Sequence, residues 1–158
     1  MFSKLEHFKL HVKESKCHLL MASVEFLGHM LDADGVHVEK GKIEAVSAWP
    51  VPRNLTEVQQ FLVLANYYHR FVFRFSELAG PWIRLTHKGV SFEWSEACQT
   101  AFDTLKSCLT SAPCLKVFDD MRPIRVVCDA SDFCVGSVLE QCVDGQWHPV
   151  EFYSKRLN

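Results

Sequence analysis

The stretch from Arg125 to Gln141 is the sequence feature that most constrains how this chain folds. Apolar and polar side chains alternate with a period of two on both sides of a break at residues 131–133, which is typical of half-buried strands joined by a turn. The dipeptide Asp144-Gly145 tolerates the positive φ of a tight hairpin turn, and a further run, residues 148–153, follows it. The pattern therefore predicts three antiparallel strands, with one carboxylate, Asp129, near the end of the first.

Upstream of this sheet the sequence predicts strands and then helices. Two apolar runs, 17–21 and 24–31, end at Asp34-Gly35 and are followed by residues 36–38, a pattern that indicates strands joined by tight turns. Apolar residues then recur at helical spacing, and capping residues mark the helix ends. The expected helices run from Glu39 to Trp49, from Asn54 towards Phe75, from Pro81 to Gly89, and from Ser95 to the residue before Pro113.

Composition narrows the class of protein. The chain has 158 residues, of which 48% are hydrophobic, enough for a real core in one or two small domains. The seven cysteines are scattered without a Cys-x-x-Cys pair, which favours reduced thiols in a cytoplasmic or nuclear setting over secretion. No apolar run reaches membrane-spanning length, so no membrane partner is expected.

Charge is unevenly distributed, although the net charge is only −2. Residues 1–90 carry 11 Lys and Arg against 9 Asp and Glu, whereas residues 91–158 carry 6 against 10. A polyanion is therefore expected on the first half of the chain.

Six segments of the sequence form motifs: VEFLGH at 24–29, FLVLANYYHRF at 61–71, FEWSEACQTAFDTLKSCLTSAP at 92–113, DASD at 129–132, GSVLEQ at 136–141 and HPVEFYSKRL at 148–157. Taken in chain order, these motifs resemble the Pol polyprotein of gypsy-type LTR retrotransposons. The last three of them resemble the opening of the family's ribonuclease H domain, whose first strand ends in Asp-Ala-Ser-Asp, as at Asp129–Asp132. Val63 and His69 depart from the family pattern, where Gly and Arg are usual.

The resemblance implies an α+β fold in three parts. Residues 1–38 would be the end of the reverse transcriptase palm with a primer-grip-like β-hairpin, and residues 39–90 a helical thumb-like bundle. Residues 91–158 would be a connecting helix and a three-stranded antiparallel sheet that forms an incomplete ribonuclease H-like domain. We expected these to behave as two loosely coupled units divided near residue 90.

Asp129 matches the metal-binding carboxylate of that family, so the resemblance assigns it a catalytic and Mg²⁺-binding role. Hydrolysis by two metal ions needs several converging carboxylates, and one aspartate holds Mg²⁺ only weakly. Asp132, Glu140 and Glu151 are expected to be turn or solvated residues, and Asp119-Asp120 a turn. The polymerase aspartates and most nuclease carboxylates would lie outside this chain, which is then expected to be inactive alone and to bind no Mg²⁺ tightly.

The resemblance also implies contacts with a primer–template duplex or an RNA/DNA hybrid. Gly28 could let the backbone approach nucleic acid closely, or it could mark a bulge in a strand. The aromatic residues of the helix after Asn54 could stack on bases, although core packing is the simpler interpretation. The candidate nucleic-acid-binding residues are Phe26, Leu27, Gly28, His29, Lys40, Lys42, Asn66 and Arg70.

Three functional interpretations stay open at this point. The chain could be a piece of an RNA-directed DNA polymerase and ribonuclease H, working with the remainder of the Pol polyprotein. It could be a binding module that holds nucleic acid without chemistry. It could also be the product of a decayed element, in which case the exposed edge of an unfinished sheet would favour aggregation.

Overall fold

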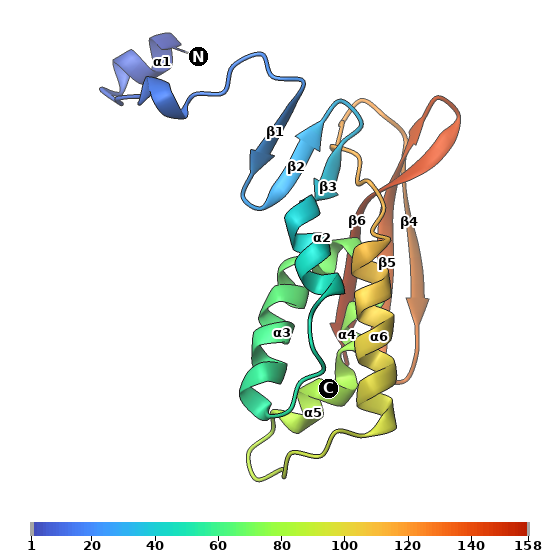
Figure 1. Ribbon diagram of the computed structural model, residues 1–158. Helices are drawn as coiled ribbons and strands as arrows, with labels where there is room; N and C mark the ends of the chain where they lie inside the picture. The colour runs from blue at the N-terminus through green and yellow to red at the C-terminus, as the bar shows by residue number, and fades with distance from the viewer. Residues whose placement is uncertain (1, 158) are drawn as a thin grey trace.

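The computed structural model describes residues 2–157 (Figure 1), so the outermost residues of the expected first and last domains, Met1 and Asn158, lie outside it. Two three-stranded antiparallel sheets lie at either end of a run of helices in the chain. The helices are α1 (Phe2–His7), α2 (Lys40–Ser47), α3 (Leu55–Tyr67), α4 (Phe75–Leu78), α5 (Gly80–Leu85) and α6 (Glu96–Thr110). The strands are β1 (Ser23–Phe26), β2 (His29–Asp32), β3 (Val36–Val38), β4 (Ile124–Ala130), β5 (Cys134–Val143) and β6 (Gln146–Arg156).

The first sheet has the order β1-β2-β3. The apolar run 24–31, expected to lie between two turns, is itself divided by a turn at Leu27-Gly28 into β1 and β2, and residues 36–38 form β3 as expected. The expected strand at residues 17–21 is absent, and this segment has no regular structure. Strand β3 is held from its far side, where Leu115 and Val36 exchange both backbone hydrogen bonds at 2.9 and 2.7 Å. A Cβ on Gly35 would lie 2.2 Å from the Leu115 carbonyl oxygen, so glycine allows this close contact.

The helices begin where the capping residues predict. The Asn54 side chain accepts a hydrogen bond from the Glu57 N–H at 3.0 Å, and the Glu57 carboxylate accepts from the Arg53 N–H at 2.7 Å. Ser95 caps α6 by accepting from the Cys98 N–H. None of the helices within residues 2–157 is long and apolar enough to cross a membrane.

The prediction that the helix after Asn54 continues towards Phe75 is wrong, because α3 ends at Tyr67. A 3₁₀ turn at His69–Phe71 follows, and Arg74 adopts a left-handed conformation with φ of 55° before α4 begins. The helical spacing of apolar residues continues past the break because the residues after it, among them Phe71 and Phe75, are buried in the same core as α3. This spacing therefore predicted one continuous helix.

One apolar core crosses the expected division near residue 90, so the expectation of two loosely coupled units is wrong. The rings of Phe61 and Phe102 lie 4.8 Å apart, and the ring of Trp82 lies 5.3 Å from that of Phe61. The Trp82 indole N–H donates to the Cys98 carbonyl oxygen at 3.0 Å. Helix α6 therefore packs into the same core as α3 and α5, and the boundaries of the three expected parts stay predictions.

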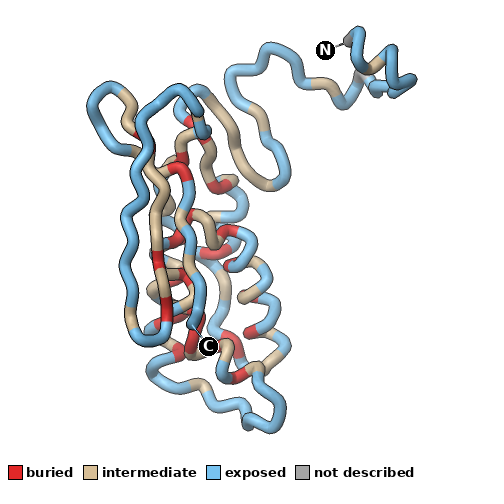
Figure 2. Tube along the Cα trace, turned by 180° about the vertical axis from the view of Figure 1, so that it is seen from behind, coloured by how far each residue is buried: buried red, intermediate tan, exposed pale blue. Residues whose placement is uncertain are grey.

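The second sheet has the order β4-β5-β6, as the alternation predicts, and Asp144 and Gly145 form its hairpin turn with φ of 51° and 79°. Strands β5 and β6 face the helices, with Ser76 and Ser154 exchanging two hydrogen bonds of 3.0 Å. The expectation that the first strand is half-buried is wrong. Every residue of β4 is exposed (Figure 2), because no helix of the described chain covers this strand.

We expect Phe61→Ala to lower the free energy of unfolding by about 3–5 kcal/mol, because it removes a ring from the centre of the shared core. Phe61 is 1% exposed, whereas Val63 on the same helix is 73% exposed, so Val63→Ala should change stability by less than about 0.5 kcal/mol. Urea unfolding followed by tryptophan fluorescence and circular dichroism checks both values. Two separate transitions in the unmodified chain would contradict the shared core.

Candidate nucleic-acid interface

The turn between β1 and β2 is clamped by two tyrosines from the end of α3. The Tyr68 hydroxyl donates a hydrogen bond to the Gly28 carbonyl oxygen at 2.8 Å, and the Tyr67 hydroxyl donates to the Leu27 carbonyl oxygen. The His29 ring stacks on Tyr67 with centroids 5.4 Å apart and meets Tyr68 edge-on at 5.4 Å. These contacts fix the turn against the helical layer.

Gly28 is explained by the turn itself. Leu27 and Gly28 have φ of 48° and 67°, the conformation of a two-residue hairpin turn of type I′. Phe26 and His29 pair directly, and the register from β1 to β2 is unbroken, so the alternative of a bulge is wrong. A Cβ on Gly28 would lie 3.5 Å from the tyrosine hydroxyls, and the backbone conformation, not lack of space, favours glycine here.

The clamped turn presents two apolar side chains to solvent. Phe26 is 60% exposed and Leu27 is 70% exposed. Because the tyrosines hold the backbone carbonyls, the turn keeps its conformation while these side chains point away from the core. The result is a rigid apolar tip, the Phe26–Leu27 tip, that can pack against a flat partner.

His29 faces inward, in contrast to its neighbours in the turn. Its ring lies among Tyr67, Tyr68 and Phe71. Burial, together with the nearby positive charge of Arg70, lowers the pKa of His29 below its usual value. The imidazole is therefore neutral at neutral pH, and it supports the turn through packing instead of offering a charge to phosphate.

The predicted cationic and polar residues gather near the same end of the molecule. Val38 pairs with His29, and α2 begins two residues later with Lys40 and Lys42 exposed in its first turn. Asn66 is exposed near the end of α3. The Arg70 guanidinium lies 3.4 Å from the Glu151 carboxylate on β6, so its charge is partly compensated. The two lysines are the more available cations.

Asp129 lies in a different environment from the one its expected role requires. Its Oδ2 atom is 3.1 Å from Nη1 of Arg74, whose Nε lies 2.5 Å from the Glu77 carboxylate. Asp129 pairs with Gly136 on β5, and a Cβ on Gly136 would lie 2.8 Å from Cγ of Arg74. Glycine at this position leaves the room in which the Arg74 side chain crosses β5 to reach Asp129.

The residues present do not fit a Mg²⁺ site. Within residues 2–157 no cluster of three or more His, Cys, Asp or Glu side chains could hold a metal ion. The nearest charged partner of Asp129 is a guanidinium, whereas Mg²⁺ needs several converging oxygen ligands. The metal-binding role of Asp129 stays a prediction that needs residues beyond this chain.

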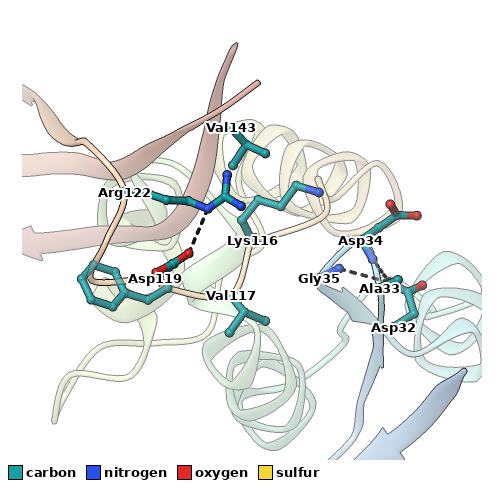
Figure 3. A pocket seen from close by; sticks show the side chains of 10 residues that line it. Asp32, Ala33, Asp34, Gly35, Lys116, Val117, Asp119, Arg122 and Val143 are labelled. Carbon is teal, nitrogen blue, oxygen red and sulfur yellow. Dashed lines mark hydrogen bonds and ion pairs between the residues drawn. The ribbon is translucent and has the colours of Figure 1, made fainter. Parts of the chain in front are cut away.

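A hollow of about 350 Å³ separates the β2–β3 turn from the segment before β4 (Figure 3). The Asp32 and Asp119 carboxylates that line it accept hydrogen bonds from residues of their own turns. Burial raises the pKa of Asp32, but hydrogen bonds from His37 and from the backbone of Asp34 and Gly35 outweigh it and hold the pKa low. The Asp119 carboxylate accepts a hydrogen bond from the Met121 N–H, which lowers the pKa of Asp119. The expected turn at Asp119-Asp120 is confirmed.

Sequence reasoning missed the residues that hold these sites in place. Tyr67 and Tyr68 act on a turn 40 residues away, and Arg74 reaches a strand 55 positions later. Gln141 is buried, and its side-chain amide makes two hydrogen bonds to the backbone of Asp119, at 2.8 and 2.5 Å. The motifs contain Tyr67, Tyr68 and Gln141 but not Arg74, and only the tertiary contacts show what each residue does.

Comparison with known proteins gives the same overall assignment along the chain. Residues 94–158 match the family described as the RNase H-like domain found in reverse transcriptase. The Tf2-3 and Tf2-4 transposon polyproteins of Schizosaccharomyces pombe are each 33% identical over the whole chain. The chain spans about 12% of the length of these relatives.

Solved structures show the same fold with 26% identity. The foamy viral protease-reverse transcriptase in complex with RNA/DNA hybrid matches 91% of this chain and 20% of its own, with a TM-score of 0.74. The same protein in complex with dsDNA matches 91% of this chain and 30% of its own, with a TM-score of 0.75. The resemblance to a retrotransposon polyprotein with a reverse transcriptase RNase H-like domain is therefore confirmed, and the finer boundaries stay predictions.

We expect Tyr68→Phe to lower the free energy of unfolding by about 1 kcal/mol near neutral pH, because the Gly28 carbonyl loses its hydrogen bond. Burial, with the charges of nearby groups, raises the pKa of Tyr68 from 10.0 to about 12. The protonated hydroxyl therefore stabilises the fold fully below pH 10.0, and this contribution is lost as the pH rises to about 12.

Urea unfolding of both proteins across this pH range measures the difference. The difference in the free energy of unfolding should shrink as the pH rises above 10.0, because the tyrosine of the unfolded state ionises first. Tyr153→Phe is the matched control, because Tyr153 is 53% exposed on β6, and it should leave stability unchanged. A Tyr68→Phe variant as stable as the unmodified chain at neutral pH would contradict the clamp.

Proposed function

We propose that this chain is a piece of a retrotransposon reverse transcriptase and ribonuclease H that holds a primer–template duplex or an RNA/DNA hybrid. The observation that carries the proposal is the Phe26–Leu27 tip, fixed by the tyrosine clamp and placed beside the first turn of α2. A rigid apolar tip next to exposed lysines suits a ligand that has both flat rings and phosphates.

The two kinds of contact have different tasks. Lys40 and Lys42 would neutralise phosphates, which supplies most of the affinity that does not depend on sequence. Phe26 and Leu27 would pack against sugar or base faces and fix the position of the duplex without reading its sequence. Arg70 and Asn66 would add polar contacts from the end of α3.

The comparisons support this proposal by analogy. Foamy viral protease-reverse transcriptases of the same fold were solved with dsDNA and with RNA/DNA hybrid. In this chain the two tyrosines hold the glycine turn and its exposed tip in place. This arrangement could hold a duplex without catalysing any reaction. We propose that the chain binds nucleic acid and does not cleave it alone, and that Asp129 acts only within the longer polyprotein, with Mg²⁺.

We expect the chain to bind an RNA/DNA hybrid with an affinity whose logarithm falls linearly with the logarithm of salt concentration. The double variant Lys40→Gln/Lys42→Gln should reduce the magnitude of this slope by about 1.8, since each phosphate contact contributes about 0.9. Fluorescence anisotropy with a labelled hybrid measures it. The matched control is Lys88→Gln/Lys155→Gln, which changes two exposed lysines elsewhere and should leave the slope unchanged.

Leu27→Asn separates the apolar contact from the charged one in the same assay. Asparagine tolerates a positive φ, so the turn at Leu27 is kept while its apolar side chain is removed. Affinity should fall at every salt concentration with an unchanged slope. Binding that is undetectable at low salt, or independent of salt, would remove the proposal.

We expect Asp129→Asn to abolish cleavage of the RNA strand of a hybrid by the polyprotein that contains this segment. The amide cannot supply the negative charge that a metal ion needs. Asp132→Asn is the control, because Asp132 lies in the exposed turn after β4. If Asp129→Asn left cleavage unchanged, this would contradict the catalytic part of the proposal without affecting the binding part.

A further inference from the structure

Arg74 stands in a backbone conformation that is costly for it. It is the N-cap of α4, with φ of 55° and ψ of 32°, and this left-handed region is unfavourable for a residue with a Cβ. Its carbonyl accepts hydrogen bonds from the Glu77 and Leu78 N–H groups at 3.0 and 3.2 Å, which begin α4. Such a conformation persists only where the surroundings fix it, so the point from which the Arg74 side chain leaves the backbone is fixed as well.

A path across the second sheet is open to this side chain. Ser76 donates two hydrogen bonds of 3.0 Å to Ser154, from its N–H to the hydroxyl and from its hydroxyl to the carbonyl, and thereby holds α4 on β6. Arg74 passes over β5 at Gly136, where a Cβ would lie 2.8 Å from Cγ of Arg74. A side chain at residue 136 would therefore obstruct the path to β4.

The guanidinium of Arg74 lies between two carboxylates. Its Nε atom is shielded from solvent and lies 2.5 Å from Oε2 of Glu77, and its Nη1 atom lies 3.1 Å from Oδ2 of Asp129. The Arg74 side chain is 30% exposed, whereas that of Asp129 is 49% exposed. A planar guanidinium presents its donors in a rigid fork, so Glu77 orients the group whose other end faces Asp129.

We propose that Arg74 is the internal cation of Asp129, a positioning residue that holds this carboxylate and excludes a metal ion from its Oδ2 atom. The proposal rests on the function proposed above, in which Asp129 acts with Mg²⁺ within the longer polyprotein. A Mg²⁺ ion lies about 2.0–2.1 Å from its ligand oxygen, and Nη1 of Arg74 is 3.1 Å from Oδ2. An ion on Oδ2 would therefore lie within about 5 Å of the guanidinium, where two positive charges repel each other.

The pair links the accessibility of Asp129 to the helical layer. Arg74 ends the break that follows α3, the helix whose C-cap, Tyr68, holds the candidate nucleic-acid turn. Asp129 lies on β4, in the second sheet. A change in how α4 lies on this sheet would draw Arg74 away and free Asp129 for another cation. The poor fit of Asp129 to a metal site is then a property of the closed pair.

Line broadening by Mn²⁺, recorded on the backbone amide NMR signals of the chain, tests the proposal. Mn²⁺ takes carboxylate ligands and broadens the signals of nuclei near the ion. In the unmodified chain the Asp129 and Ala130 signals should stay sharp. Arg74→Gln removes the charge and leaves Glu77 and Asp129 facing the same space, so both signals should lose most of their intensity at the same Mn²⁺ concentration. Arg74→Gln/Asp129→Asn should restore them.

Gly136→Ala reaches the same state while Arg74 is kept, because the added Cβ obstructs the path of its side chain, and it should broaden the same signals. Arg53→Gln is the matched control, since Arg53 is exposed ahead of α3 and should leave them sharp. Circular dichroism shows that each variant keeps the fold. Signals that broaden equally in the unmodified chain and in Arg74→Gln, or that stay sharp in both, would overturn the proposal. Either result would leave the proposed function intact, because hybrid binding and its salt dependence are measured separately.

Discussion

The structure depends on one apolar core that α6 shares with α3 and α5. Phe61, Trp82 and Phe102 meet at its centre, and the segment after α6 carries this connection to both sheets. Leu115 bonds to β3, and the next residue, Lys116, donates to the Pro149 carbonyl on β6 at 2.8 Å. The two sheets are thus held by adjacent residues of one segment, and neither sheet would keep its place if α6 left the core.

The turn that we assign to nucleic acid is a consequence of this packing. Tyr67 and Tyr68 reach the turn from the last residue and the C-cap of α3, and Tyr68 is buried there. A helix continued to Phe75 would carry the following residues away from β2. The break in α3 also sets Arg74 in its left-handed conformation, from which its side chain crosses Gly136 to Asp129. The end of α3 and the break that follows it therefore serve the two candidate sites, the first through its tyrosines and the second through Arg74.

Much of the fold could be predicted from local signals, and the failures have a common cause. Asn54 with Glu57, Ser95, and Asp144-Gly145 act within a few residues, so the sequence predicts the helix starts and the hairpin turn. The predicted length of α3 was wrong because the periodic spacing of apolar residues indicates which residues are buried, not whether the helix is continuous. Asp129 was found by its motif, but its pairing with Arg74 depends on a left-handed residue and a glycine that are far apart in sequence.

Strand β4 shows that the alternation of apolar residues is not sufficient to predict burial. A period of two predicts a strand with one face to be covered, and the pairing of β4 with β5 agrees with it. Burial requires in addition an element that covers the face, and no helix of the described chain does so. An alternating pattern therefore predicts that a strand forms and which residues share a face, but not which element covers that face.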